Sequence, residues 1–574
     1  MKTLQYEERT IHERLQFLYG KETAKKALDD ITKLILHYKQ KVVSASYHLS
    51  EIDSVLITYG DQVQYLNEAP LAVLKRFLDV HVKGVINSIH ILPFHPYSSD
   101  DGFSIVNYSK VDPKMGSWRE IQDISKEYRL MLDGVINHVS QYSDWFKAYL
   151  AGDPEYKDFF IEIDPTTDLS KVVRPRATPL LSEFVDKEGK IHNIWTTFSK
   201  DQVDLNYKNY KVLIKVLDAL FYYIQNGATL IRLDAIAFIY KEIGTSCVHL
   251  PQTHELVQLI REVLHEVAPE IIIITETNVP HQENISYFGS GDDEAQMVYN
   301  FALPPLLAYS ILQADTKKLT NWAQSLTLPS DKVCFFNFTA SHDGCGLRSV
   351  QGILTAKEVE MLIETTLNHG GLVSYRQTDE GEKPYELNCS YIDILSHPDD
   401  NITLRAKRML VTQAVMLAMP GVPGIYFHSL VGSHNYPEGV TLTGNNRSIN
   451  RQKFNYDYLQ ERLSQDGHIE KMIFTVYKKL LSIKIHETAF NPFGEFEFLN
   501  IHSGIFAILR HAKDKQQSIL ALHNFTNNDI KLRLSNDLVY PLYDILANNK
   551  TYEAGDITIA SYQSMWLKSI KDNI

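Results

Sequence analysis

The chain has 574 residues, of which 44% are hydrophobic and 22% are charged, and its formal net charge is −13. A chain of this length buries a large core and is expected to form more than one folded unit. The negative charge argues against nucleic acid or an anionic membrane surface as a partner. No apolar run approaches the length of about 20 residues that a helix needs to cross a bilayer.

The N-terminal region and the cysteines indicate where the protein works. The first 17 residues mix charges of both signs and lack the apolar segment of a signal peptide. The four cysteines show neither the spacing of metal ligands nor that of a disulfide framework; they are Cys247, Cys334, Cys345 and Cys389. We therefore expect a cytoplasmic protein.

Short apolar runs bounded by turn residues alternate with helical patterns along most of the chain. They predict eight strands, near residues 55–59, 85–92, 130–136, 230–235, 271–275, 297–301, 333–340 and 423–427. The intervening patterns predict helices, for example at residues 71–82, 118–128, 212–225, 253–267 and 403–419. Strands that are apolar nearly throughout are typical of a buried parallel sheet. The alternation predicts a closed (β/α)8 TIM barrel, and a doubly wound open sheet is the alternative.

Other segments do not belong to a plain barrel. Residues 140–207 are rich in Asp, Pro, Thr and aromatics, which predicts a small domain B inserted after the third strand, at the rim where barrel enzymes build their sites. Near the C-terminus the pattern predicts strands at 505–509, 519–523, 530–534 and 557–566. The predicted units are an N-terminal helical extension (1–50), a barrel in two parts (51–139 and 208–490), the inserted domain (140–207) and a C-terminal all-β domain (491–574).

Charged residues gather where four of the predicted strands end. Arg232 and Asp234 lie two residues apart on one strand, so their side chains point the same way, and the cation keeps the carboxylate ionised. Taken alone, this pair fits a buried structural salt bridge equally well. The other clusters are Asp133 with Asn137 and His138, Thr275 with Glu276, and Ser341 with His342 and Asp343.

A closed barrel brings these strand ends around one cavity. Cleavage of a glycosidic bond needs two carboxyl groups, one ionised and one protonated. Asp234 suits the ionised nucleophile, and Glu276 suits the general acid because it follows an apolar strand that partly desolvates it. Asp343 is expected to stabilise the charged transition state, and His138 and His342 to donate to sugar hydroxyls. Each cluster alone fits a turn, a helix cap or a solvated group, whereas their joint position favours an active site.

Four segments resemble, in order and spacing, the conserved regions of glycoside hydrolase family 13, the α-amylase family of retaining α-glucosyl enzymes: DGVINHVS (133–140), IRLDAIAF (231–238), ITETN (274–278) and TASHDG (339–344). Others are similar to the sucrose phosphorylase branch: RPR (174–176), KEIGTSC (241–247), FALPPLL (301–307), PGVPGIY (420–426) and SINR (448–451). Residues 98–104, residues 275–295 and the N-terminal extension resemble a related group of enzymes, the 2-O-α-glucosylglycerate phosphorylases. The likeness covers roughly residues 52–570.

The resemblance implies that Asp234 is the nucleophile, Glu276 the acid/base and Asp343 the transition-state stabiliser. It implies transfer of a glucosyl group between glucosylglycerate and inorganic phosphate, without a cofactor or a metal, in a protein that forms a homodimer. The alternative to a protein without a metal is one that binds a structural calcium ion, as many amylases do. Around the bound glucose the resemblance places Asp100, Phe103, His138, Arg232, His342 and Arg451.

Glycerate and phosphate are both anions, so local cations and donors must bind them in this acidic protein. Arg174 and Arg176 flank a proline that fixes the backbone, and both are expected to present their guanidinium groups toward the cavity. Asn278 and His281, just past Glu276, are expected to add donors. A solvated loop is the alternative interpretation of the RPR segment.

Two positions depart from the sucrose phosphorylase branch. Phe238 replaces an aromatic hydroxyl, and Glu386 replaces the glutamine of an acceptor loop. Glu386 would repel an anion unless it faces away or pairs with an arginine. Acceptor identity rests on few residues, so phosphorylases of sucrose, sucrose 6-phosphate or glucosylglycerol are alternatives. An α-glucosidase that uses water and a non-catalytic carbohydrate-binding subunit are alternatives of other classes.

Overall fold

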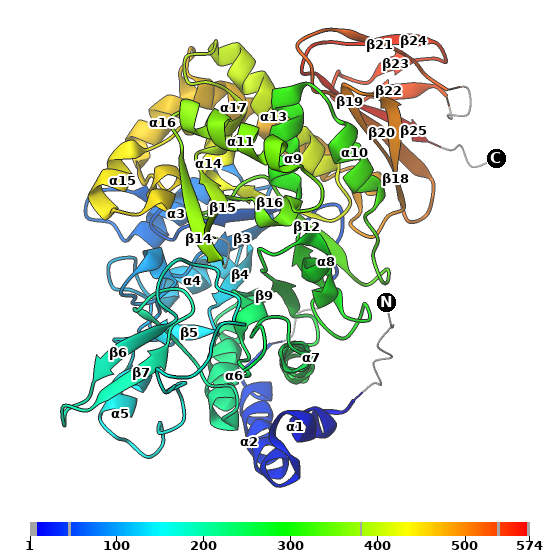
Figure 1. Ribbon diagram of the computed structural model, residues 1–574. Coiled ribbons are helices and arrows are strands. Elements are labelled where there is room, and N and C mark those ends of the chain that lie inside the picture. The colour runs from blue at the N-terminus through cyan, green and yellow to red at the C-terminus, as the bar shows by residue number, and fades with distance from the viewer. Residues whose placement is uncertain (1–8, 44–46, 379–380, 536–539, 571–574) are drawn as a thin grey trace.

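The computed structural model describes residues 9–43, 47–378, 381–535 and 540–570. Its centre is a closed barrel of parallel strands in the spatial order β1-β16-β12-β11-β10-β9-β4-β3 (Figure 1). The strands are β1 (Val55–Thr58), β3 (Ser88–Ile91), β4 (Arg129–Gly134), β9 (Ala228–Leu233), β10 (Ile272–Thr275), β11 (Met297–Tyr299), β12 (Cys334–Phe338) and β16 (Val422–Tyr426). Each overlaps a predicted strand. The predicted TIM barrel is confirmed, and the open-sheet alternative is wrong.

Helices cover the outside of the barrel. The five that the sequence predicts are α3 (Pro70–His81), α4 (Trp118–Ser125), α6 (Tyr210–Gln225), α7 (Pro251–His265) and α13 (Ile402–Ala418). They bury one apolar side each against the strands, in the manner of amphipathic helices. No helix within the described ranges is both long enough and apolar enough to cross a membrane.

The inserted segment after the third barrel strand is tied to the barrel by a buried lysine. The segment contains β5 (His138–Ser140), α5 (Asp144–Leu150), β6 (Leu181–Val185), β7 (Ile191–Trp195) and β8 (Gln202–Asp204). Strand β5 pairs antiparallel with β8, which sets Asp204 opposite His138. The Lys241 ammonium lies 2.5 Å from Asp204 Oδ2 and 2.8 Å from Asn137 Oδ1. This ion pair holds the insert against the end of β4.

A hairpin that the sequence analysis missed stands at the same rim. Strands β14 (Leu372–Thr378) and β15 (Gly381–Asn388) pair antiparallel, and β15 also pairs with the short strand β13 (Cys345–Gly346). Tyr385 and Glu386 on β15 are both buried. The hairpin therefore brings two side chains from a distant part of the sequence to the rim where Asp343 lies.

The C-terminal segment forms two antiparallel sheets. Six strands have the order β18-β19-β20-β25-β22-β23, and β21 pairs with β24. The strands are β18 (Phe496–His502), β19 (Ile505–His511), β20 (Gln517–Asn524), β21 (Ile530–Arg533), β22 (Leu542–Asp544), β23 (Lys550–Tyr552), β24 (Asp556–Ile559) and β25 (Ser564–Ile570). The single strand predicted at 557–566 is wrong. The chain turns at Tyr562, whose φ is 51°, so β24 and β25 belong to different sheets.

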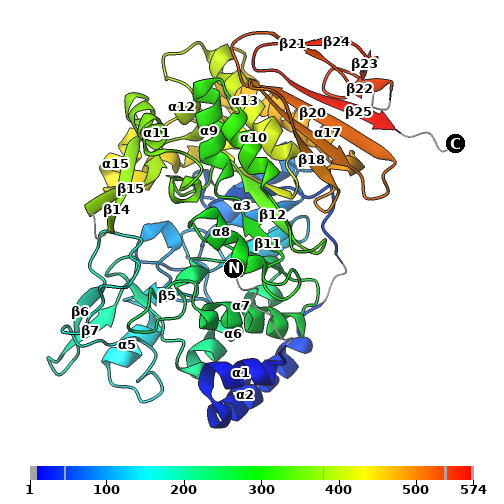
Figure 2. The ribbon, with the colours of Figure 1, turned by 45° about the vertical axis from the view of Figure 1, so that its right-hand side comes forward.

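The N-terminal extension is a helical hairpin of α1 (Ile11–Tyr19) and α2 (Lys21–Lys39). The buried Arg14 on α1 donates to Glu255 Oε1 at 2.9 Å and to Glu262 Oε2 at 3.1 Å, both on α7. On α2, the Tyr38 hydroxyl donates to Asp218 Oδ1 of α6 at 2.8 Å. Figures 1 and 2 show this hairpin and the C-terminal sheets at opposite ends of the molecule. Residues 1–8 and 44–46 of the predicted extension lie outside the described ranges.

Candidate active site

A cavity of about 60 Å³ lies at the carboxyl ends of the barrel strands. The three predicted catalytic acids, Asp234, Glu276 and Asp343, share its wall. Six other predicted site residues also line it, namely Asp100, Phe103, His138, Arg176, Asn278 and His342. The strand-end clusters therefore converge on one space, as the barrel topology requires.

Arg232 connects the acids from beneath the cavity wall. Its side chain is only 2% exposed, and Nη1 donates to Asp133 Oδ1 at 2.5 Å and to Asp234 Oδ1 at 2.7 Å. Its Nη2 lies 3.8 Å from Glu276 Oε2. The backbone N–H of Ala235 donates to the same Glu276 oxygen at 3.2 Å. One guanidinium thus holds the two predicted reacting carboxyl groups side by side.

The surroundings of Asp234 and Glu276 separate their protonation states. Burial raises the pKa of Glu276 to about 7, because Arg232 only partly offsets the desolvation and the charges of Asp234 and Asp343 add to it. Burial also raises the pKa of Asp234, and Arg232 opposes that shift from a shorter distance. A proton shared between the two carboxyl groups therefore stays on Glu276. Below about pH 7 this pair therefore consists of one ionised and one protonated carboxyl group.

Asp343 has its own cation, Arg447, which the sequence analysis missed. Arg447 Nη1 lies 2.5 Å from Asp343 Oδ1. Burial raises the pKa of Asp343, but Arg447 and the more distant Arg232 and Arg451 outweigh burial and lower it overall. The sequence does contain a signal for Arg447, because this residue immediately precedes the SINR segment (448–451), which resembles the sucrose phosphorylase branch.

The same arginine explains Glu386. Arg447 Nε donates to Glu386 Oε1 at 2.8 Å, and Nη2 donates to Oε2 at 2.9 Å, in a two-bond fork. Burial raises the pKa of Glu386, but Arg447 more than offsets this effect and lowers the pKa overall. The carboxylate is therefore ionised, and the charge of Arg447 balances its own. Glu386 pairs with an arginine, as the sequence analysis required of a carboxylate near an anion site.

The two histidines are fixed as walls of the cavity. His138 Nε2 donates to the carbonyl of Phe103 at 2.9 Å, and Gln202 from the inserted segment donates to the same carbonyl at 3.3 Å. The His342 ring stacks on the Phe103 ring with centroids 4.7 Å apart. Burial, with nearby arginines, lowers the pKa of His342 well below its ordinary range, so its ring is neutral.

Besides Arg232, which lies beneath the wall, three predicted residues do not line the cavity. Arg451 lies behind the wall, where its Nε donates to the carbonyl of His342 at 2.7 Å. Arg174 folds back onto the carbonyls of its own loop, Ala177 and Thr178. His281 points into the apolar packing around Trp322 and Phe335, and burial lowers its pKa to about 4. The expectation that Arg174 and His281 face the cavity is therefore corrected.

Metal binding has little support in the side chains. Among the described residues, no group of three or more His, Cys, Asp or Glu is placed to hold a metal ion. The buried oxygens of Asn137 and Asp204, beside the active site, are already satisfied by the Lys241 ammonium. In the cavity, Asp234 and Asp343 are each paired with an arginine. The chemistry available to the site is acid–base and nucleophilic chemistry by carboxyl groups.

Comparison with known proteins places this site in context. A family model described as alpha amylase, catalytic domain, matches residues 82–376. Glucosylglycerate phosphorylase of Spirochaeta thermophila is 43% identical, over 98% of this chain and 99% of that protein. Glucosylglycerate phosphorylase of Allomeiothermus silvanus is 46% identical, over 84% and 87%. The crystal structure of sucrose 6F-phosphate phosphorylase from Thermoanaerobacter thermosaccharolyticum has a TM-score of 0.73 at 24% identity, over 84% of this chain and 94% of that one.

The double role of Arg447 generates a stability prediction. Arg447→Met leaves the carboxylates of Asp343 and Glu386 without their cation, and Glu386 is only 1% exposed. We expect the free energy of unfolding to fall by about 3–5 kcal/mol. Adding Glu386→Gln removes one of the stranded charges, so the double variant should recover more than about 1 kcal/mol. Urea unfolding followed by tryptophan fluorescence measures the wild type, Arg447→Met and the double variant.

Lys332→Met is the matched control for this cycle. Lys332 pairs with Asp292 at 2.8 Å, but both side chains are more than half exposed, so its loss should change stability by less than about 1 kcal/mol. Equal effects of Arg447→Met and Lys332→Met would contradict the buried pairing.

Proposed function

The chain belongs to the α-amylase family, and we propose that it is a retaining glycoside phosphorylase that transfers an α-glucosyl group between glucosylglycerate and inorganic phosphate. Its products in the forward direction are α-D-glucose 1-phosphate and D-glycerate. One observation of the site carries this proposal: a nucleophile, a protonated acid and an unpaired arginine line the same cavity. Two relatives named glucosylglycerate phosphorylase, which match 98% and 84% of this chain, support the choice of glycerate.

In the first step Asp234 attacks the anomeric carbon of the glucosyl unit. Arg232 keeps this carboxylate ionised at 2.7 Å. Glu276 gives its proton to the oxygen that links glucose to glycerate, so the carbon–oxygen bond breaks and glycerate leaves. Asp343, ionised beside Arg447, stabilises the positive charge that develops on the sugar ring. The result is a β-glucosyl ester of Asp234.

In the second step a phosphate oxygen attacks the anomeric carbon and displaces Asp234. The configuration inverts twice, so the α-configuration is retained. Glu276 is now ionised and regains a proton from the attacking phosphate, which returns the site to its starting state.

Arg176 is the side chain best placed to recognise an anion. It lines the cavity and its Cζ lies 5.4 Å from the ring centroid of Tyr385. Within the described ranges no carboxylate forms an ion pair with Arg176, whereas Arg447 is occupied by Asp343 and Glu386. Asn278, also in the wall, has a buried Oδ1 without a hydrogen-bond partner. The free guanidinium suits the carboxylate of glycerate and then phosphate. The amide oxygen of Asn278 suits a hydroxyl group of glycerate, from which it can accept a hydrogen bond.

The compartment and the oligomeric state are part of the proposal. We place the protein in the cytoplasm, which agrees with four cysteines that are all free. The homodimer that the resemblance implied stays a prediction.

The acceptor is tested by running the reaction in reverse. Purified protein is given α-glucose 1-phosphate with D-glycerate, glycerol, fructose or fructose 6-phosphate, and phosphate release is measured. We expect D-glycerate to give the highest kcat/KM, because it alone combines a free hydroxyl with a carboxylate for Arg176. Asp234→Asn protein, folded but lacking the nucleophile, serves as the blank. Release with fructose alone, or glucose formation that does not depend on phosphate, would overturn the proposal.

The pH dependence follows from the state of Glu276. The leaving oxygen needs the proton, and the pKa of Glu276 is raised to about 7. We therefore expect kcat/KM for glucosylglycerate to be level just below pH 7 and to fall about tenfold per pH unit above it. A pH profile of phosphorolysis measures this limb.

A substrate with a leaving group that needs no proton is the control for this profile. With 4-nitrophenyl α-glucoside the alkaline limb of the first step should disappear. Persistence of the same limb with that substrate, or in Glu276→Gln protein, would assign the titration to another group.

Arg176 and Arg174 provide a matched pair for anion recognition. Arg176→Gln removes the free guanidinium from the cavity, and we expect the KM for phosphate to rise roughly tenfold or more while kcat changes less. Arg174→Gln, in the same loop but outside the cavity, should leave both constants near those of the wild type. Initial rates over a range of phosphate concentrations decide this, and equal effects of the two substitutions would refute the assignment.

A further inference from the structure

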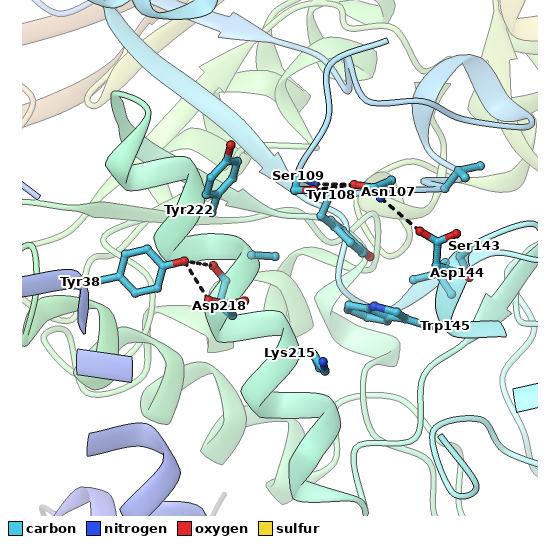
Figure 3. Close-up of a pocket in the computed structure, with 13 residues that line it drawn as sticks. Tyr38, Asn107, Tyr108, Ser109, Ser143, Asp144, Trp145, Lys215, Asp218 and Tyr222 are labelled. Carbon is cyan, nitrogen blue, oxygen red and sulfur yellow. Dashed lines mark hydrogen bonds between the residues drawn. The ribbon is translucent and has the colours of Figure 1, made fainter. Parts of the chain in front are cut away.

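A second cavity, drawn in Figure 3, is lined by residues of the N-terminal helical hairpin, the inserted segment and α6, and none of the three catalytic acids lines it. Its volume is about 240 Å³, against about 60 Å³ for the active-site cavity. Four aromatic residues from four parts of the chain line it, namely Tyr38 of α2, Tyr108 of the loop after β3, Trp145 of α5 and Tyr222 of α6. The mechanism uses none of them.

The rings of this cavity are held in place through contacts with the protein. The Tyr108 hydroxyl donates to the carbonyl of Val135 at 2.7 Å, and its ring packs against Trp145 with centroids 5.4 Å apart. The Tyr38 hydroxyl is engaged by Asp218. Figure 3 shows these side chains around a common space, with the Tyr38 hydroxyl turned toward Asp218. The hydroxyls of the two tyrosines are thus used within the fold, and the buried Tyr38 ring is stacked on Phe221 with centroids 5.1 Å apart. The half-buried rings of Tyr108, Trp145 and Tyr222 are the ones that a ligand can reach.

The polar groups around the rings favour a neutral ligand that carries hydroxyls. Asp144 and Asp218 are exposed carboxylates in the cavity wall, and Asn107 donates to Asp144 Oδ2 at 3.3 Å. Among the described residues of the wall, Lys215 carries the only ammonium group, and it is paired with Glu155 at 3.1 Å. Two carboxylates against a single, already paired cation disfavour an anion. Carboxylate oxygens accept from hydroxyl groups, while aromatic rings pack on apolar C–H surfaces.

We propose that this cavity is a second carbohydrate-binding site, distinct from the catalytic one, which takes a neutral glucoside of one or two sugar units. A sugar ring offers both an apolar C–H face and a rim of hydroxyls, and the cavity offers both complements. The second cavity is large enough for a sugar, because it is larger than the active-site cavity, which takes a glucosyl unit in the proposed function. Only this comparison of size rests on the proposed function. The N-terminal extension contributes Tyr38 and thereby closes one side of the site.

Maltose is the probe for this site, and saturation-transfer NMR on the full-length protein is the measurement. We expect maltose binding that becomes roughly tenfold weaker in Tyr222→Leu. Tyr142→Leu is the matched control: Tyr142 is 54% exposed in the same inserted segment but lies outside the cavity, so binding should be unchanged. Trp145→Leu is a second variant that removes another ring, in case Tyr222→Leu does not fold.

His342→Ala separates this site from the catalytic cavity. We expect His342→Ala protein to keep maltose binding that is sensitive to Tyr222→Leu. The inference is overturned if maltose does not bind at millimolar concentrations, if Tyr222→Leu and Trp145→Leu bind as the wild type does, or if His342→Ala alone abolishes binding. Phosphorolysis is assayed in parallel. Loss of maltose binding with turnover intact supports the second site, and absent turnover with intact maltose binding counts against the proposed function alone.

Discussion

The active site depends on one buried guanidinium. Arg232 is almost fully enclosed, and a cation so deep in the protein is tolerated only where carboxylates surround it. Asp133, itself bonded to His90 at 2.7 Å, and Asp234 supply the two close partners. Asp133 on β4 and Arg232 on β9 are register partners, as are Arg232 and Ile274 on β10. The register of these three barrel strands therefore places Arg232 where it keeps the nucleophile Asp234 ionised, so a change in register would change both.

The distribution of cations decides which acid keeps its proton. Arg232 lies close to Asp234, and Arg447 lies close to both Asp343 and Glu386. Among the residues that the structure describes, no cation lies nearer to Glu276 than Arg232 at 3.8 Å, and Glu276 is the carboxyl group whose pKa rises to about 7. The role of general acid follows from the absence of a close partner at Glu276, in a cavity where the other buried acids each have one.

The sequence predicted what is local in the chain and missed what only the fold brings together. The barrel strands follow from apolar runs, and Arg232 with Asp234 follows from alternation on one strand. In contrast, Arg447 and Glu386 are separated by 61 residues and meet through a hairpin that carries no strong strand pattern. Arg174 and Arg176 were equal candidates on the sequence alone. Loop geometry alone turns the first onto its own carbonyls and leaves the second in the cavity.

The additions to the barrel connect the active site with the second cavity. The inserted segment supplies Gln202 to the wall of the active site and Trp145 to the second cavity. Tyr108 lies between them: its ring lines the second cavity, and its hydroxyl is 3.3 Å from the carbonyl of His138, an active-site wall residue. The linings of the two cavities are thus separated by a single hydrogen-bonded side chain, because the ring that faces one cavity contacts, through its hydroxyl, the backbone that carries a wall residue of the other.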